Sequence, residues 1–247
     1  MSIIRVYVDG YNLYAGGVRW TRFRWLDVAA LADRLAGKPV QRVIYCTAMC
    51  KGTKSDPEKP SRQEAYWAAL RSTGRIEIMK GLFQPRTKSV AVKKCRQDTP
   101  CLIRVKTWEE KGSDVNLGAR LVHDGHFCRY EHAIVVSGDS DLVEPIRLVT
   151  EELHRQVTVF NPRDRTQEDL QRVATNYRTI RPSIYEDCQL PDQIHHDGRV
   201  IHKPAELSEP PEPSAGYVRL DGVCGDCGAS VETVQFLPCP HFNGGEI

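Results

Sequence analysis

Short apolar segments alternate with segments of helical periodicity through the first 176 residues of the chain. The segments typical of strands are 3–8, 41–48, 76–79, 133–137 and 157–160. The segments typical of amphipathic helices are 25–35, 61–72, 113–123, 142–153 and 166–176. This alternation predicts an α/β fold, with a mainly parallel sheet covered by helices on both faces. Ligands of such sheets bind beyond the carboxyl ends of the strands, so these ends are where chemistry is expected.

Residues 81–108 interrupt this alternation. Segments 90–92 and 102–108 are typical of the two strands of a hairpin, which the sequence predicts as an insertion. The basic residues of this region are Arg86, Lys88, Lys93, Lys94, Arg96, Arg104 and Lys106. Two interpretations remain open for them. They attract the phosphate chain of a nucleic acid, or they are solvated charges that keep an edge of the sheet from aggregating.

The length of 247 residues accommodates one large α/β domain and an appendage. We expect a catalytic domain over 1–185, a proline-rich acidic arm or linker over 186–216, and a small tail over 217–247. No segment reaches the roughly 18 apolar residues of a membrane span, and the first residues are typical of a strand, not of a signal peptide. We therefore expect a cytoplasmic protein with reduced cysteines and no membrane partner.

Acidic residues gather at three places where a predicted strand ends or a predicted helix begins. With their neighbours, the candidate site residues are Asp9, Asn12, Lys111, Asp114, Asp139 and Asp141. Carboxylate ligands without His or Cys select hard ions, Mg²⁺ or Mn²⁺, and such ions activate phosphodiesters towards water. Each aspartate alone is equally typical of a helix cap. Three acidic loops at matching positions of one sheet favour a metal site.

Three segments carry a family resemblance: Asp9-Gly-Tyr-Asn12, Lys111-Gly-Ser-Asp114-Val-Asn-Leu and Val-Ser-Gly-Asp139-Ser-Asp141-Leu-Val-Glu-Pro-Ile. In this order they resemble the NYN domain family, relatives of PIN-domain ribonucleases, and in particular a bacterial branch once described as a domain of unknown function. The resemblance covers about residues 3–206. It implies a Rossmann-like three-layer sandwich whose acidic pocket binds divalent metal and hydrolyses nucleic acid, usually RNA.

The resemblance matches these acidic positions and Asn12, and we assign the site residues their roles as a hypothesis. Asp9, Asp139 and Asp141 would bind metal directly or through water, and Asp114 would complete the site or orient the attacking water. Asn12 would hold that water or a phosphate oxygen. Lys111 would balance the carboxylates or contact the scissile phosphate, unless it is a solvated surface lysine.

The chain departs from the family pattern at two positions. Many NYN domains carry a further acid where this chain has Arg120, so its site is expected to hold one metal ion more firmly than two. Relatives often have Asn where this chain has Gly138, a change expected to loosen the turn slightly without removing a carboxylate.

Aromatic and basic residues are interleaved in the loop that follows the first motif. They are Tyr11, Tyr14, Trp20 and Phe23 with Arg19, Arg22 and Arg24. This composition suits the stacking of single-stranded bases, and it suits equally the packing of the loop on the next helix. We favour packing for Trp25 and Leu26.

The tail holds four residues of types that bind tetrahedral Zn²⁺: Cys224, Cys227, Cys239 and His241. The Cys-x-His spacing of the second pair is tighter than usual, so a structural zinc site and reduced cysteines in a flexible tail both remain open. Either way, the tail is a candidate docking module for a protein partner, a nucleic acid or a second copy of the chain.

These observations predict a metal-dependent nuclease that acts on single-stranded RNA in preference to DNA. The main alternative is a catalytically weak NYN-like subunit that binds RNA or acts as a scaffold, which the departure at Arg120 keeps open. A weaker alternative is a phosphatase for small phosphate esters. The chain contains neither a dinucleotide-binding glycine motif nor a P-loop motif.

Overall fold

The computed structural model describes residues 3–52, 56–92 and 101–210, together with four two-residue strands of the tail. The chain divides into two compact units, residues 1–83 with 110–210 and residues 84–109 with 211–247. In the second unit, β10 (Tyr217–Val218) pairs with β13 (Val234–Gln235) and β11 (Gly222–Val223) pairs with β12 (Ser230–Val231). Both pairs are antiparallel.

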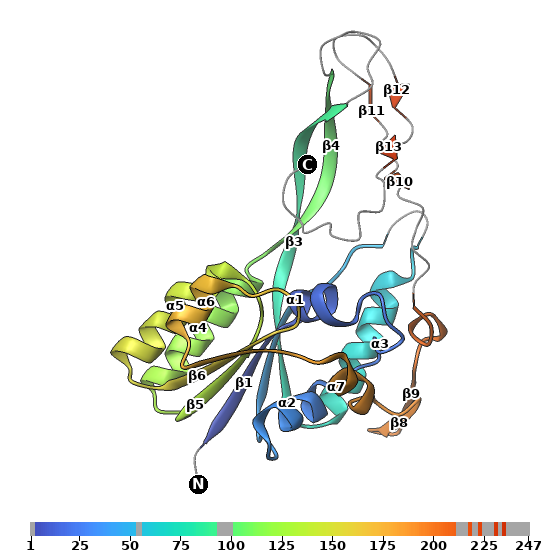
Figure 1. Cartoon of the computed structure of the whole chain (residues 1–247). Helices are drawn as coiled ribbons and strands as arrows, with labels where there is room; N and C mark the ends of the chain where they lie inside the picture. Colours follow the sequence, from blue (N-terminus) through green and yellow to red (C-terminus); the bar gives the residue numbers. More distant parts are fainter. Residues whose placement is uncertain are drawn as a thin grey trace. The chain divides into compact units, whose positions relative to one another are not determined.

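A seven-stranded sheet has the strand order β4-β3-β2-β1-β5-β6-β7 (Figure 1). The strands are β1 (Ile4–Asp9), β2 (Val43–Ala48), β3 (Ile76–Val92), β4 (Cys101–Lys111), β5 (His132–Val136), β6 (Gln156–Asn161) and β7 (Asn176–Thr179). The pairings from β3 through β2, β1, β5 and β6 to β7 are all parallel. Strand order reverses between the central neighbours β1 and β5, and at such a switch point a crevice forms at the carboxyl edge.

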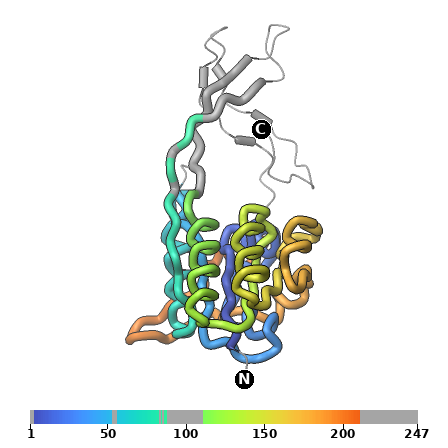
Figure 2. Tube along the Cα trace, turned by 90° about the vertical axis from the view of Figure 1, so that its left-hand side faces the viewer, coloured from blue at the N-terminus to red at the C-terminus, as the bar shows by residue number. Residues whose placement is uncertain are grey.

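Helices cover both faces of the sheet. Helices α4 (Ser113–His126), α5 (Val143–Arg147) and α6 (Glu168–Val173) lie on one face (Figure 2), and α2 (Val28–Ala36), α3 (Lys59–Ser72) and α7 (Pro182–Asp187) lie on the other. The predicted α/β sandwich is therefore confirmed. No helix in the described part of the chain is long and apolar enough to cross a membrane.

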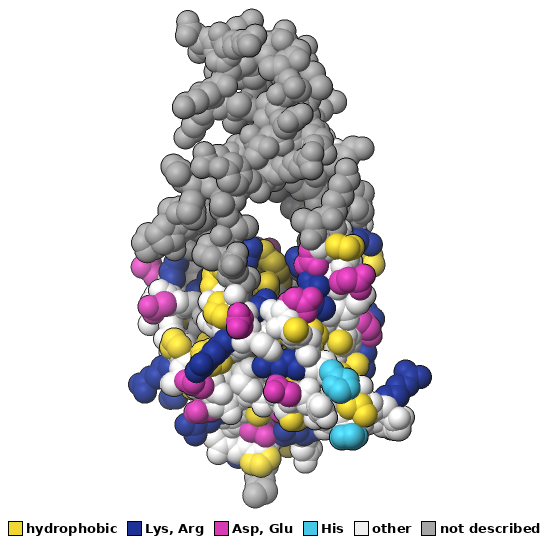
Figure 3. Space-filling model, turned by 90° about the vertical axis from the view of Figure 1, so that its right-hand side faces the viewer, with side chains coloured by type: hydrophobic (Ala, Val, Ile, Leu, Met, Phe, Trp, Pro, Cys, Tyr) yellow, Lys and Arg dark blue, Asp and Glu magenta, His cyan; other side chains and the backbone are white. Residues whose placement is uncertain are grey.

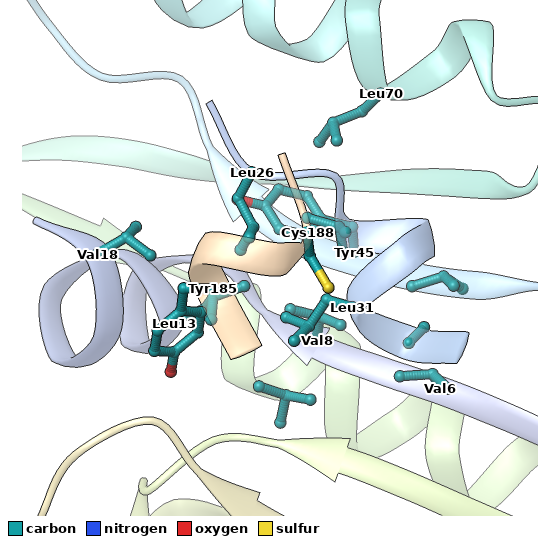
Figure 4. Packing of buried hydrophobic residues seen from close by; sticks show 14 of the residues in the cluster. Val6, Val8, Leu13, Val18, Leu26, Leu31, Tyr45, Leu70, Tyr185 and Cys188 are labelled. Atoms are coloured by element: carbon teal, nitrogen blue, oxygen red, sulfur yellow. The ribbon is translucent and has the colours of Figure 1, made fainter. Parts of the chain in front are cut away.

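Strand alternation builds two cores, one under each helical layer. Val6 and Val8 of β1 point to the α2 side, whereas Tyr7 between them joins the core under α4. Figure 4 shows Val8 next to Leu31 and Cys188, with Val6 farther along the same strand. Because β1 is buried on both faces, it is a rigid support for the residues at its end.

Short helical turns and a hairpin complete the first unit. They are α1 (Gly10–Leu13), η1 (Tyr14–Val18), η2 (Ser140–Leu142), η3 (Leu148–Glu152), η4 (Ala205–Leu207) and the antiparallel strands β8 (Gln193–His196) and β9 (Arg199–His202). Figure 3 shows basic and acidic side chains interspersed over the described part of the face with α3 and this hairpin. The ion pairs Arg22–Glu186 and Arg62–Glu206 are in keeping with that distribution.

Residues 188–207 pack on the first unit, whereas the sequence predicted a linker from residue 186. Leu190 N donates to Trp25 O at 3.0 Å, and Asp27 N donates to Cys188 O at 2.9 Å. The side chains of Cys188 and Leu190 are buried in the core beside α2. This segment has few apolar residues among its prolines and acids, so it shows no pattern typical of a packed element. A short hairpin can nevertheless pack with only one or two buried apolar side chains. Residues 211–216 lie outside the described residues.

Three element boundaries differ from expectation. Strand β3 was expected to end at residue 79, but it continues through Gly81 and Pro85. Its pairing with β2 ends at Gly81, so the missing N–H of Pro85 removes no hydrogen bond to β2. Helix α3 begins at Lys59, so Ser61 is inside its first turn and is not its cap. The end of the predicted helix 166–176 is an extended segment leading into β7.

Candidate active site

Three carboxylates meet at the switch point of the sheet. Asp9 is the last residue of β1, Asp139 follows β5, and Asp114 lies in the first turn of α4. Each offers one oxygen, and these oxygens lie within 4.8 Å of one another. Parallel pairing of β1 with β5 brings two of the three loops together, because the carboxyl ends of neighbouring strands share one edge.

Asp9 is the buried member of this group, only 3% exposed. Its Oδ1 accepts a hydrogen bond from Asn12 N at 2.9 Å, and its Oδ2 accepts one from Ser137 Oγ at 2.8 Å. Burial raises the pKa of Asp9 to about 7, the charges of Asp114 and Asp139 raise it further, and the two hydrogen bonds oppose the rise. A cation between the carboxylates would restore the ionised form of Asp9.

Asp139 is both a cap and a member of the group. Its Oδ1 accepts a hydrogen bond from Asp141 N at 3.0 Å at the start of η2, while its own N donates to Ser137 Oγ at 3.1 Å. The helix-cap interpretation of this aspartate is thus compatible with the metal-site interpretation. Asp141 is exposed, and its carboxylate is not among the three that come together.

Asn12 joins the first acidic loop to the third. Its side chain is 5% exposed, and Oδ1 accepts a hydrogen bond from Gly138 N at 3.2 Å. This oxygen therefore holds the turn before Asp139. Ser137, which is fully buried, was not among the residues predicted from the sequence. Its position directly after an apolar strand, next to Gly-Asp, was the available signal.

Gly138 allows a close contact that the sequence did not predict. A Cβ at this position would overlap the side-chain amide of Asn161, the last residue of β6. Asn161 is 1% exposed, donates from Nδ2 to Arg165 O at 2.7 Å and to Tyr177 Oη at 2.8 Å, and accepts from Arg163 N at 2.9 Å. Gly138 therefore serves tight packing, in contrast to the looser turn expected from the sequence.

The Lys-Gly-Ser-Asp element rests on the backbone of β3. Gly112 has a φ of 89°, a left-handed conformation that favours glycine, and lets the chain turn from β4 into α4. A Cβ on Gly81 would lie 2.6 Å from Ser113 Oγ and 2.8 Å from Lys111 O, so Gly81 permits this approach. Lys111 itself is exposed at the end of β4.

Arg120, the departure from the family pattern, takes part in an ion cluster. Its Nη1 donates to Glu77 Oε1 at 2.9 Å, and its Nε donates to Asp124 Oδ1 at 3.1 Å. The guanidinium therefore balances two carboxylates of β3 and α4.

The loop after Asp9 divides into exposed and buried aromatic residues. Tyr11 and Trp20 are 55% and 54% exposed, and the guanidinium of Arg19 lies 4.6 Å from the Trp20 ring centre. Trp25 is fully buried and donates from Nε1 to Pro191 O at 2.9 Å. Packing thus accounts for Trp25, and the exposed rings remain available for a ligand.

For several residues, the nucleic-acid-binding or zinc-binding role expected from the sequence stays a prediction. Arg86 is exposed on β3. Lys88, Arg104 and Lys106 belong to β3 and β4, but their side chains lie outside what the structure describes. The residues outside the described part of the chain are Lys93, Lys94, Arg96, Cys224, Cys227, Cys239 and His241.

Comparison with known proteins identifies the family. The model of the family described as NYN domain matches residues 3–181, which include all three acidic loops. The chain belongs to the NYN domain family. NYN domains are part of the PIN-like superfamily of nucleases, as the resemblance of the three motifs implied.

Two individual proteins resemble this NYN domain chain. The 6-hydroxy-3-succinoylpyridine 3-monooxygenase HspA of Pseudomonas putida (strain DSM 28022 / S16) is 28% identical over 192 residues. The match covers 64% of this chain and 59% of that protein, so the chain spans little more than half of its relative's length. The crystal structure of a protein of unknown function from Vibrio parahaemolyticus RIMD 2210633 matches with a TM-score of 0.46 and 19% identity, covering 76% of this chain and 96% of that one.

Proposed function

We propose that this NYN domain protein is a metal-dependent nuclease that hydrolyses phosphodiester bonds of single-stranded RNA in the cytoplasm. The observation that supports it is the convergence of three carboxylate oxygens within 4.8 Å at the switch point. Oxygen donors of this kind suit Mg²⁺ or Mn²⁺, and the raised pKa of Asp9 is what a site built for a cation produces in the cation's absence.

Asp9, Asp114 and Asp139 would hold the ion. When bound, a divalent ion supplies Lewis-acid stabilisation of the phosphate charge and lowers the pKa of bound water. Hydrogen bonds from Asn12 N and Ser137 Oγ orient the Asp9 carboxylate before any ligand arrives. Asp141, exposed two residues after Asp139, would contact water around the site, and Lys111 would contact a phosphate.

The preference for a single strand is supported by two exposed rings in the segment that follows Asp9. Tyr11 follows Asp9 by two residues, and Trp20 lies in the same loop. Flat exposed rings stack on unpaired bases, each worth about 1–3 kcal/mol, but not on bases inside a duplex. The preference for RNA over DNA comes from the family alone.

The test is cleavage of labelled single-stranded RNA and DNA with Mg²⁺, Mn²⁺ or EDTA. We expect Asp139→Asn to lower the rate by on the order of 100-fold, since it removes a charge from the group of three. Asn at position 139 still accepts the bond from Asp141 N, so folding is preserved. Asp141→Asn is the matched control, and its loss is expected to stay within about tenfold.

Three results would argue against the proposal. If wild type and Asp139→Asn cut RNA equally well, the cutting does not take place at this site. Cutting that persists in EDTA would exclude the metal. RNA binding without cutting of either polymer would favour an RNA-binding or scaffolding subunit.

A further inference from the structure

A hollow of about 470 Å³ opens at the carboxyl ends of β6 and β7. Its lining consists of Phe160, Arg178, Thr179, Arg181 and Ile184. Phe160 is buried and Ile184 is half-buried, whereas both arginines are exposed. The hollow therefore combines an apolar lining with two guanidinium groups, and its volume is within the roughly 300–1,000 Å³ of ligand pockets.

Two more arginines follow β6, and with the first two they form what we call the β6–β7 arginine cluster: Arg163, Arg165, Arg178 and Arg181. Among the described residues none of the four pairs with a carboxylate, whereas Arg62, Arg75 and Arg147 elsewhere in the fold do. Segments 161–165 and 176–181 contain one acid, the exposed Asp164, so their net charge is 4 − 1 = +3. Unpaired guanidinium groups suit phosphate, and two of the four line the hollow.

The cluster is connected to the carboxylates through Asn161. The Asn161 side chain lies against Gly138, next to Asp139, and it holds Arg163 N and Arg165 O. The stem of Arg163 also packs on the loop after Asp9, since a Cβ on Gly16 would lie 2.6 Å from Arg163 Cγ. The arginine cluster and the acidic group therefore share one edge of the sheet.

We propose that the hollow is a nucleotide subsite for the strand that flanks the scissile phosphate. The arginines of the cluster bind backbone phosphates, and a base lies against Phe160 and Ile184. That the ligand is an RNA strand rests on the proposed function. That the ligand carries phosphate and a base is inferred from the residues that line the hollow. None of the residues of this subsite belongs to the basic hairpin predicted from the sequence.

The test is the binding of a labelled single-stranded RNA to the full chain in EDTA, followed by fluorescence anisotropy at several salt concentrations. We expect Arg178→Ala/Arg181→Ala to weaken binding about tenfold or more and to reduce the slope of log K against log salt by about 1.4. Arg178→Lys/Arg181→Lys restores the slope but only part of the affinity, because lysine lacks the bidentate fork. The matched control is Arg199→Ala, an exposed arginine of β9.

Binding by the alanine variant equal to that of Arg199→Ala would overturn the subsite. Tighter binding of a 5′-nucleoside monophosphate than of the strand, lost in the same variant, would assign the hollow to a free nucleotide and overturn the strand as occupant. Inorganic phosphate is the third ligand. If it displaces the labelled RNA as well as the monophosphate does, the base contributes nothing to binding, and the contact of a base with Phe160 and Ile184 is overturned.

EDTA separates this test from that of the nuclease. A chain that never cuts RNA but loses RNA binding in the alanine variant keeps the nucleotide subsite and overturns the nuclease, and with it only the scissile phosphate as the neighbour of the subsite. A chain that cuts RNA normally while the variant binds unchanged keeps the nuclease and overturns only the subsite.

Discussion

At the scale of single residues, the geometry of the acidic group depends on small and uncharged neighbours. Ser137 and Asn12 fix the loop around Asp9 by hydrogen bonds, and Gly138 lets β6 approach that loop. The carboxylates carry the charge, but the loops of Asp9 and Asp139 are held together by a hydroxyl, an amide and a missing Cβ. Substitutions at these neighbours are expected to act through position and not through charge.

Gly138→Ala is expected to destabilise the protein by about 1–3 kcal/mol, because the new methyl group overlaps Asn161. Urea denaturation of the variant measures this cost. In an Asn161→Ala background the same substitution should cost clearly less, since the overlapping amide is gone. An equal cost in both backgrounds would show that the overlap is not its cause.

Sequence reasoning located the charged members of the site but not their support. Asp9, Asp114 and Asp139 were predicted because strand ends and helix starts have recognisable patterns. Asn161 was not, because its role arises from β5 and β6 lying side by side, a pairing that no local pattern contains. Asp141 was predicted as a ligand from the Ser-Gly-Asp-Ser-Asp motif and its family resemblance, and the 3-10 turn that begins at Ser140 leaves it exposed.

At the scale of elements, charge holds α4 in place near its carboxyl end. Its first turn carries Asp114, and Asp124 near its other end is fully buried among cations. Asp124 accepts hydrogen bonds from Tyr7 Oη at 2.9 Å, Arg5 Nη1 at 2.6 Å and Arg129 Nη1 at 3.0 Å. The cluster ties α4 to the start of β1, which keeps the helix in register with the strand that ends in Asp9.

This cluster predicts acid sensitivity. Burial by itself would raise the pKa of Asp124, but the hydrogen bonds from Tyr7 and Arg5 outweigh it and lower the pKa to about 2. Because the native pKa lies below that of the unfolded chain, the ionised carboxylate stabilises the fold above about pH 4, and this contribution is lost as pH falls towards 2. Urea unfolding from pH 7 to pH 2.5 measures the dependence.

Asp124→Asn is the comparison for that series. It should cost about 3–5 kcal/mol at pH 7, because three arginines lose their buried partner, and the difference from wild type should shrink as the pH falls. A difference that stays constant down to pH 2.5 would exclude Asp124 as the titrating group.

The sequence predicted the strands whose residues are buried in continuous runs, and it missed the strands whose residues are mostly exposed. Strands β1, β2, β5 and β6 have runs of buried apolar residues, which a sequence pattern detects. Strand β7 has three exposed residues and one half-buried residue, and β9 has a similar pattern. Their strand conformation comes from pairing with a neighbour, not from their own composition.

At the scale of the whole molecule, the first unit depends on a segment distant in sequence from its centre. Cys188 and Leu190 pack in the core beside α2, and Ile194, Ile201 and Leu207 lie against it. The sequence gives this segment few apolar residues and many turns, so its contribution was visible only in the assembled fold.

A chain ending at Asp187 is therefore expected to lose its cooperative thermal transition. Burial of each large apolar side chain contributes about 1.5–3 kcal/mol, and a domain has about 5–15 kcal/mol in all. The control is a chain ending at Pro210, which keeps every described contact of the first unit and should melt as the full chain does. Similar melting of both shortened chains, followed by circular dichroism, would contradict this role of residues 188–207.

The same segment determines when the fold can form during translation. Asp9 leaves the ribosome 181 residues before Leu190, which packs in the same core as Val6 and Val8 of β1. Domains fold as units during synthesis. A nascent chain thus carries its three carboxylates long before it can hold them together, and any activity that needs the group is withheld until residues 188–207 have left the ribosome.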